Sequence, residues 1–486
     1  MTVLVIDIGS SSVRTLLFDD NAQPIADAEA SRKHSFTTTP PGAAVADADE
    51  LRTMTESCMD EMLQHPAAGQ ITVVGIDTFV GNMLGVDEDG EALTPIFTYA
   101  DTRSANDVER LRRQIDVEAA HQRTGCINHT AYQPGRWLWL RRANPQQFDA
   151  VARWIDLGTY LYTRWFGQGA CSYSVASWSG LLNRATLDWD DEWLRILDVD
   201  KSRLPPLADY NQVQAGLLPE YARRWPVLRD TPFCLAVGDG AAANVGAGCV
   251  DESRIALTVG TTAALRIVSS AQLPSVPPGL WSYRVDAAHH LIGGATTEGG
   301  NIFQWARSTL SLGDDLEEQL AHCQPDRHGL TFLPLLAGER SPGWATNAAG
   351  AVTGLRLSTT SLDILQAALE GVALRLSLIA DQLKPLASED FTLMGGGGAL
   401  VASPAWAQMI ANALNHPLHI TREMEITARG TAILALRAIG QCHLSAHPPA
   451  IAETIQPNEE HARIMRAARE RQIHLYRKII PEEWNP

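Results

Sequence analysis

Asp239, which stands between two glycines in Gly238-Asp239-Gly240, is the first candidate for chemistry in the sequence. It follows the apolar, strand-like residues 233–237 and precedes the helix-like residues 241–244, so it would lie at a strand-to-helix turn. The flanking glycines would leave room for a substrate on both sides. A carboxylate at such a turn could accept the proton of an alcohol during phosphoryl transfer, which otherwise needs mainly positioning and charge neutralisation. An aspartate that only caps the helix is the alternative.

Two turns made of a glycine followed by hydroxyl residues could hold phosphate groups. Such a turn points successive backbone N–H groups into one concavity, where phosphate oxygens bind. The first turn follows Asp7, a carboxylate that could hold Mg²⁺ through water, although a structural hairpin with a buried aspartate is the alternative. The turn residues are Gly9, Ser10, Ser11 and Ser12 in the first hairpin and Gly260, Thr261 and Thr262 in the second.

The two turns lie about half the chain apart, and each connects two apolar strands, the second of which carries an arginine. The second copy reads as one residue longer in the turn. Chance resemblance between two hairpins is the alternative to a duplicated architecture. As a pair, the hairpins suggest a nucleotide held in a cleft between two domains. The sequence contains neither G-x-x-x-x-G-K-[ST] nor a G-x-G-x-x-G after the first strand, so other nucleotide motifs are not supported.

Three further segments carry polar or glycine-rich patterns. Gly395-Gly396-Gly397-Gly398 follows the apolar residues 391–394, and four glycines there would let the backbone approach a flat ligand or a phosphate. A flexible turn is the alternative. Asp101 and Arg103 could hydrogen-bond vicinal hydroxyls of a sugar, although an exposed ion pair is an equal alternative. Asp77 and Thr78 place polar groups at the end of another apolar strand.

The elements that must position these residues repeat along the chain. Apolar, β-branched runs predict strands at 2–8, 13–18, 71–76, 255–259 and 263–268. Helical spacing predicts a helix at 47–63, and the charge pattern predicts an exposed helix at 104–122. Further helices are expected at 362–384 and 403–414, in the alanine-rich residues 427–440 and in the charged, amphipathic residues 458–478. The repeat predicts two large domains with a boundary near 246–250.

Charge and composition exclude several classes of protein. The 486 residues carry 39 Lys+Arg against 56 Asp+Glu, a net charge of −17, which argues against broad nucleic-acid binding. No apolar run is long enough for a membrane span, and no basic segment precedes an apolar one at the N-terminus, so neither a membrane anchor nor a signal peptide is expected. The seven scattered cysteines form no C-x-x-C pair, so a reducing cytoplasm is the expected location.

Several motifs together resemble the FGGY carbohydrate kinases, the group of glycerol kinase, xylulokinase and gluconokinase. The resemblance covers residues 3 to 440. Its most specific part is Gly350-Ala351-Val352-Thr353-Gly354-Leu355 followed, after seven residues, by 363–370. Gly338-Glu339-Arg340-Ser341-Pro342 looks like the family's G-E-R-x-P segment. Arg136-Trp137-Leu138-Trp139 resembles a K-x-x-W core, with Arg136 in place of lysine.

The resemblance implies an α/β fold of two actin-like ATPase (ribonuclease H-like) domains, residues 1–246 and 247–486, with the catalytic cleft between them. It implies ATP and Mg²⁺, with Asp239 as catalytic base and Asp7 and Asp239 at the metal. The two hairpins would bind the phosphates. The adenosine would lie at Gly396, Gly397 and Gly398, and the acceptor at Asp77, Thr78, Asp101, Arg103 and Asp239.

The resemblance also implies that the acceptor is a small sugar, sugar acid or polyol. Gly75-Ile76-Asp77-Thr78-Phe79 departs from the segments typical of xylulokinases and glycerol kinases, whereas 239–246 and 293–300 resemble gluconokinases. Gluconate is therefore favoured, with xylulose or another ketose as the alternative and an actin-like ATP-binding sensor or assembly protein as the non-enzymatic one. No nucleic acid or membrane partner is expected. The roles of Arg429 and Tyr132 stay open, as does the oligomeric state, for which a homodimer is one option.

Overall fold

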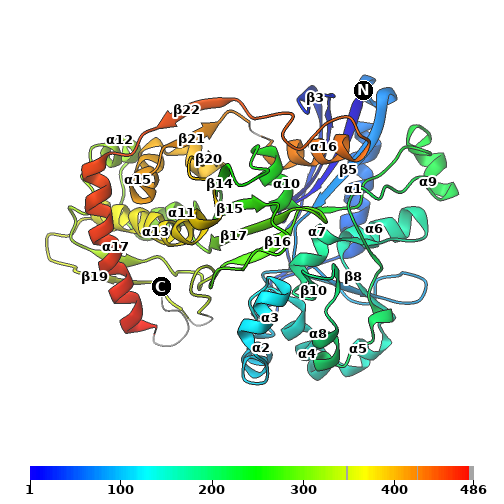
Figure 1. Ribbon diagram of the computed structural model, residues 1–486, viewed down its shortest axis with the longest axis horizontal. Helices are drawn as coiled ribbons and strands as arrows, with labels where there is room; N and C mark the ends of the chain where they lie inside the picture. The colour runs from blue at the N-terminus through cyan, green and yellow to red at the C-terminus, as the bar shows by residue number, and fades with distance from the viewer. Residues whose placement is uncertain (346–347, 424, 481–486) are drawn as a thin grey trace.

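Two β-sheets form the frame of the protein, each in its own lobe (Figure 1). The computed structural model describes residues 1–345, 348–423 and 425–480. The first sheet has the order β13-β5-β1-β2-β3. Its strands are β1 (Thr2–Ile8), β2 (Ser12–Phe18), β3 (Pro24–Lys33), β5 (Ile71–Thr78) and β13 (Val237–Gly238).

The second sheet has the order β16-β17-β15-β14-β20-β21-β22. Its strands are β14 (Arg254–Val259), β15 (Ala263–Ser269), β16 (Trp281–Arg284), β17 (His290–Thr296), β20 (Thr392–Gly396), β21 (Leu418–Thr421) and β22 (Ile451–Ile455). Both sheets contain the same arrangement of five neighbouring strands, three antiparallel strands followed across the sheet by two parallel ones. These are β3-β2-β1-β5-β13 in the first sheet and β17-β15-β14-β20-β21 in the second. The duplicated architecture that the two hairpins predict is present in this repeat.

The two hairpins differ in a way that the sequence comparison misjudges. The last paired residues before and after the first turn are Ile8 and Val13, which enclose residues 9–12. Val259 and Ala263 enclose only 260–262 in the second. The expectation of a longer second turn is therefore wrong, because the additional residues lie in β15.

Strand register brings polar residues to one edge of the first sheet. Every residue of β1 is buried, as its β-branched run predicts. The parallel pairing of β1 with β5 aligns Asp7 with Asp77, and β13 pairs with the end of β5 at Val237 and Gly238. Since carboxyl ends of parallel strands meet at one edge, the segment that begins with Asp239 starts beside these two aspartates.

Most predicted helices are confirmed, and their caps explain their bounds. They are α1 (Ala48–Met62), α13 (Ser361–Leu383), α15 (Pro404–Leu414), α16 (Ile426–Ala438) and α17 (Glu459–Ile479). Ser403 caps α15 through the Trp406 N–H, and a capping box of Thr360 and Asp363 starts α13. The single helix expected at 104–122 is wrong. Two helices form there, α2 (Ala105–Arg112) and α3 (Val117–Thr124), because Asp116 caps a new helix through the Ala119 N–H.

The remaining elements fill the space around the sheets. The other helices are α4 (Gln133–Ala143), α5 (Pro145–Ala150), α6 (Leu157–Phe166), α7 (Tyr173–Ala176), α8 (Asp191–Leu197), α9 (Pro219–Arg224), α10 (Asp239–Gly246), α11 (Asn301–Thr309), α12 (Leu316–Ala321) and α14 (Gly398–Ala402). Short strands are β4 (Val45–Ala46), β6 (Leu84–Val86), β7 (Ile96–Phe97), β8 (Arg153–Ile155), β9 (Cys171–Ser172), β10 (Leu182–Asn183), β11 (Asp188–Trp189), β12 (Leu207–Ala208), β18 (Thr331–Leu333) and β19 (Ala351–Thr353). Among the described residues, none of these helices has the length and apolar character to cross a bilayer.

Helices α10 and α16 cross where the two lobes meet (Figure 1). A Cβ atom on Gly246 would lie 1.8 Å from the Ile426 carbonyl oxygen, and one on Gly430 would lie 1.8 Å from that of Ala242. The two glycines therefore permit backbone contact between the helices. Arg429 secures this crossing, because its guanidinium donates to the carbonyl oxygens of Gly246 and His447, each at 2.6 Å. The role of Arg429, which the sequence leaves open, is therefore to hold these two segments together.

Candidate active site

A cavity of about 270 Å³ lies between the two halves of the chain. The first half supplies Tyr132, Trp178 and Asp239 to its wall, and the second half supplies Arg266 and Arg340 among others. Such a concave site between domains is typical of small-molecule binding.

Asp239 is the only carboxylate among the described residues that line this cavity. It is the first residue of α10, and its Oδ1 accepts a 2.7 Å hydrogen bond from the Gly240 N–H. Burial raises its pKa to about 6, against the opposing effect of that hydrogen bond and of the Arg266 charge. A carboxylate with this pKa is ionised at neutral pH and can still accept a proton, which suits a general base.

Aromatic side chains from both halves build one wall of the cavity. The rings of Trp178 and Tyr283 are stacked with centroids 3.6 Å apart, and Trp281 stacks on Tyr283 at 4.4 Å. The hydroxyls of Tyr132 and Tyr283 are 2.6 Å apart. Within the described ranges, the buried indole N–H groups of Trp178 and Trp281 have no hydrogen-bond partner. The wall thus offers flat apolar faces to the carbon chain of an acceptor.

The glycines beside Asp239 admit this wall. A Cβ on Gly238 would lie 3.0 Å from the Trp178 Nε1, and one on Gly240 would lie 3.2 Å from the same ring. The absence of side chains at the two glycines therefore lets Trp178 pack against the turn. The sequence predicts instead that the space beside these glycines holds a substrate. The indole, in turn, lines the cavity next to Asp239.

Two arginines make the cavity positively charged. Arg266 lies on β15, and its Nη1 is 3.4 Å from the Thr258 hydroxyl. Its buried Nε has no hydrogen-bond partner in the described residues. Burial lowers the pKa of Arg266 to about 10, which the Asp239 charge opposes. Arg340 follows β18 and also lines the cavity. Burial raises the pKa of Asp239, the one carboxylate among the described lining residues, and the charges of both arginines oppose this rise.

The second hairpin packs against two glycine-rich segments. The Gly300 N–H donates to the Gly260 carbonyl oxygen at 2.6 Å. Gly397 has φ +99°, and a Cβ there would lie 2.5 Å from the Val259 carbonyl oxygen, so only glycine permits this approach. Gly395 and Gly396 belong to β20, and Gly398 starts α14, so the glycine run spans a strand end and a helix start.

The first hairpin is tied to the second half of the chain by charge. The guanidinium of Arg14 donates to Asp7 and to Glu425, each at 2.5 Å. The turn itself closes with a hydrogen bond from the Gly9 N–H to the Ser12 carbonyl oxygen at 2.9 Å. Ser10, Ser11 and Ser12 retain solvent exposure, as do Thr261 and Thr262 of the second turn, so these hydroxyls are accessible to a ligand.

The other predicted acceptor residues lie outside the lining of the cavity. Asp77 is fully buried and accepts a 2.6 Å hydrogen bond from the Thr431 hydroxyl, and burial together with the Asp7 charge raises its pKa well above the usual range. Thr78 is also fully buried. Asp101 accepts hydrogen bonds from Arg103, whose guanidinium lies 4.3 Å from the Trp139 ring centroid. Their role towards an acceptor stays a prediction.

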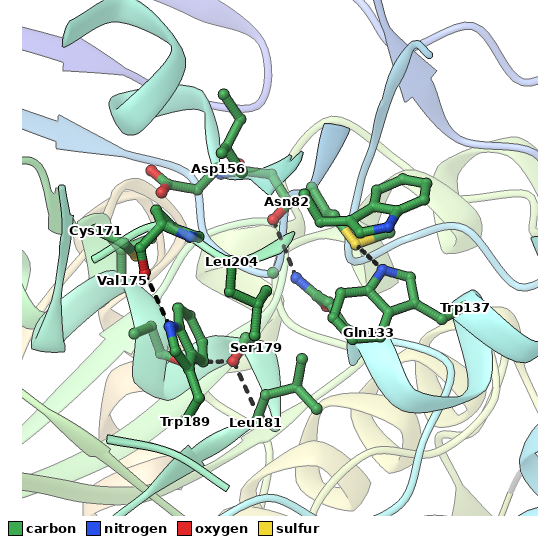
Figure 2. A pocket seen from close by; sticks show the side chains of 16 residues that line it. Asn82, Gln133, Trp137, Asp156, Cys171, Val175, Ser179, Leu181, Trp189 and Leu204 are labelled. Carbon is green, nitrogen blue, oxygen red and sulfur yellow. Dashed lines mark hydrogen bonds between the residues drawn. The ribbon is translucent and has the colours of Figure 1, made fainter. Parts of the chain in front are cut away.

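A second, smaller cavity lies inside the first half of the chain (Figure 2). Its volume of about 30 Å³ is of the order of one water molecule. Trp137, Trp189 and Leu204 surround it, and Gln133 donates a 3.2 Å hydrogen bond to the Asn82 carbonyl oxygen. A space of this size excludes a sugar. The cavity that contains Asp239 is taken as the candidate site because it holds the predicted catalytic carboxylate.

Comparisons with known proteins agree with this arrangement. Residues 2–246 match the N-terminal domain of the FGGY family of carbohydrate kinases, and residues 255–439 match its C-terminal domain. The chain is 26% identical to a gluconokinase of Bacillus subtilis (strain 168) over 493 residues, 99% of this chain and 94% of that protein. It is also 26% identical to a xylulose kinase of Escherichia coli (strain K12), over 84% of each.

Solved structures show the same fold. A gluconate kinase and a xylulose kinase, both from Lactobacillus acidophilus, each superpose with a TM-score of 0.91 at 25% identity, covering 99% of both chains. The two-domain α/β architecture expected from the resemblance is thereby confirmed. The chain belongs to the FGGY family of carbohydrate kinases, which use ATP to phosphorylate sugars and polyols.

Proposed function

We propose that this kinase phosphorylates a sugar acid, with gluconate or a close aldonate as acceptor. The observation that carries the proposal is the pair Arg266 and Arg340 in a cavity whose one described carboxylate is Asp239. A chain of net charge −17 that keeps two cations in its central cavity is suited to an anionic ligand. Arginine is the side chain best suited to a carboxylate, which it can bind through two parallel N–H groups.

In the proposed mechanism, Asp239 accepts the proton of the acceptor hydroxyl as that oxygen attacks the γ-phosphoryl group of ATP. The Gly240 N–H holds the Asp239 carboxylate at 2.7 Å, and burial keeps its pKa near 6. The aromatic wall of Trp178 and Tyr283 packs on the carbon chain of the acceptor and excludes water. The C-terminal half contributes both arginines, so the site is complete only when the two halves meet.

The two hairpins would hold the triphosphate through N–H groups and hydroxyls. The donors are Gly9, Ser10, Ser11 and Ser12 on one side and Gly260, Thr261 and Thr262 on the other. The adenosine would lie along Gly396, Gly397 and Gly398, where positive φ at Gly397 allows close backbone approach. The remaining predicted acceptor contacts lie outside the cavity lining, so domain closure would have to bring them to the acceptor. They are Asp77, Thr78, Asp101 and Arg103.

Asp7 and Asp239 fit a magnesium ion by their donor chemistry, since both offer carboxylate oxygens. Each lies close enough to the other for the Asp7 charge to contribute to the raised pKa of Asp239. When bound, the ion would neutralise phosphate charge. The Arg14 contact would then hold the second oxygen of the Asp7 carboxylate in a fixed orientation.

Other features of the protein are proposed on narrower grounds. We propose domain limits of 1–246 and 247–486, which the family matches at 2–246 and 255–439 support. A reducing cytoplasm is supported by the seven free cysteines. The negative charge supports the absence of a nucleic-acid partner. That the protein forms a homodimer stays a prediction, which a molar mass from light scattering would test.

A kinase for xylulose or another ketose is the second candidate. It is supported by the xylulose kinase from Lactobacillus acidophilus, which superposes as well as the gluconate kinase does. A ketose carries no charge and would leave both arginines to the transferred phosphate. The deciding experiment is a coupled ADP-release assay across gluconate, xylulose, ribulose, rhamnulose, fuculose, erythritol and glycerol. The proposal expects the highest kcat/KM with gluconate, and a preference for any neutral acceptor would overturn it.

A further inference from the structure

The loop of residues 338–345 carries Arg340 into the acceptor cavity and turns the preceding residue, Glu339, the other way. Glu339 is 4% exposed. A carboxylate buried to this degree needs hydrogen-bond donors from its surroundings, because an uncompensated buried charge is costly. The neighbours of Glu339 therefore bear on where Arg340 lies.

Two helices supply the partners of Glu339. Arg375 of α13 donates to its Oε1, and the phenol of Tyr476 on α17 donates to its Oε2 at 2.7 Å. The Arg375 guanidinium also lies 4.8 Å from the centroid of the Tyr476 ring. All three side chains are buried. The group thus links the C-terminal helix, which runs along the outer side of the second lobe in Figure 1, to the loop that carries Arg340.

The loop folds back over this group. The Ala345 N–H donates to the same Oε2 of Glu339 at 3.1 Å. A Cβ on Gly343 would lie 2.1 Å from the Tyr476 hydroxyl and 2.3 Å from the Glu339 Oε2, so only glycine lets the loop pass here. One carboxylate therefore fixes both ends of the segment 339–345.

The tip of the loop is fixed on the side of the cavity. The Ser341 N–H donates to the Ala295 carbonyl oxygen at 2.9 Å, and the Trp344 indole donates to that of Gly279 at 2.7 Å. Trp344 also packs edge-on against His129 of the first half, with ring centroids 5.0 Å apart. These contacts hold the backbone of Arg340 at the wall of the cavity.

We propose that Tyr476 of α17 is a positioning residue, which through Glu339 aims Arg340 at the anionic group of the acceptor. The inference rests on the proposed function in one respect, that Arg340 faces the bound acceptor. Helix α17 begins at Glu459, beyond the residues 255–439 that match the family's C-terminal domain. The C-terminal segment would then tune acceptor affinity from outside the matched region.

The test is Tyr476→Phe, which removes one hydroxyl and keeps the ring against Arg375. Loss of this hydrogen bond is expected to raise the KM for gluconate about two- to thirtyfold, the range for a residue that acts on a site through a packed network. The KM for ATP and kcat should change by less than about twofold, because neither the hairpins nor Asp239 touches this group. Tyr160→Phe is the matched control. It removes a phenol that donates to Asp49 at the same 2.7 Å, in the first half of the chain and outside the cavity lining.

A second measurement separates positioning from folding. Hydrogen exchange of residues 338–345 should be faster in Tyr476→Phe than in the wild type, while exchange of the hairpin at 260–262 is unchanged. In the Arg340→Gln background, Tyr476→Phe should add little further increase in the KM for gluconate, because the residue that it positions is gone.

Two outcomes would overturn the inference. One is an unchanged gluconate KM in Tyr476→Phe, and the other is an equal rise in the KM for gluconate and for ATP, which indicates a general structural effect. Failure of the proposed function is visible separately, since it would appear as a wild-type preference for a neutral acceptor. In that case the KM for that acceptor should not respond to Tyr476→Phe, and a response would refute the link to an anionic group.

Discussion

Replacing Asp239 with asparagine is expected to remove activity and to stabilise the fold. The amide keeps the size of the side chain and its acceptor oxygen for the Gly240 N–H, which is 2.7 Å away in the native protein. It cannot take a proton from a hydroxyl at neutral pH. General base catalysis contributes about 10²–10⁴-fold, so turnover should fall by that factor while ATP binding persists.

The stability gain follows from the pKa of Asp239. Burial raises this pKa from 3.8 to about 6, so the folded state binds the proton more tightly than the unfolded chain does. Above pH 6 the ionised carboxylate therefore costs stability. A shift of about two units, at about 1.36 kcal/mol per unit, corresponds to up to about 3 kcal/mol. The Asp239→Asn variant would recover this amount at pH 8, less as pH falls below 6, and none below 3.8.

Thermal unfolding without nucleotide or Mg²⁺ measures this effect. The difference in Tm between Asp239→Asn and the wild type should be a few degrees at pH 8 and should shrink at pH 5. Asp230→Asn is the control, because Asp230 is exposed and its replacement should change stability by less than about 0.5 kcal/mol.

Two results would refute the reasoning on Asp239. Turnover within about tenfold of the wild type would rule out Asp239 as the base. A Tm difference that is the same at pH 8 and pH 5 would show that the carboxylate does not have the raised pKa on which the argument depends. The two results are independent, since the first tests the chemistry and the second tests the burial.

Three further predictions follow from the same site and its support. Arg266→Gln should lower kcat/KM for gluconate about 10–100-fold and leave kcat/KM for a neutral acceptor within about threefold, as steady-state assays would show; an equal loss for both would assign Arg266 to the phosphate instead. The kcat/KM of the wild type should fall as pH drops through about 6, because Asp239 must be ionised to act as base, and a flat profile from pH 8 to 5 would contradict this. Gly430→Ala should lower the free energy of unfolding by about 1–3 kcal/mol, because the new Cβ would lie 1.8 Å from the Ala242 carbonyl oxygen. The control Gly69→Ala, with open space around it, should have no such effect. Equal unfolding temperatures for the two variants would argue against the tight helix crossing.

The parts of the site that depend on neighbours in sequence could be predicted from the sequence. The hairpins around Gly9 and Gly260 form as expected because strand, turn and strand are adjacent. Asp239 could be found because glycines flank it at a strand-to-helix turn. Arg340 was visible in its motif, but a motif does not tell which way a side chain points.

The aromatic wall could not be predicted in the same way. Trp178 and Tyr283 are far apart in sequence and meet only because the edge strand β16 of the second sheet packs against the first half of the chain. Asp101 and Arg103 are the converse case. The sequence left open a ligand pair and an ion pair, and in the structure the two side chains bind one another, with Trp139 against the guanidinium. Local spacing alone does not tell whether such a pair also contacts an acceptor, so that role stays a prediction.

The most direct test of the proposed acceptor compares gluconate with glucitol in the wild-type enzyme at saturating ATP. The two molecules share their carbon chain and hydroxyl pattern from C2 to C6 and differ in that gluconate carries a carboxylate at C1. If Arg266 and Arg340 bind that carboxylate, kcat/KM for gluconate should exceed that for glucitol by about 100-fold or more, the range expected for a charged hydrogen-bonded pair. Equal kcat/KM values for the two, or a higher value for glucitol, would contradict the assignment of this protein as a sugar-acid kinase.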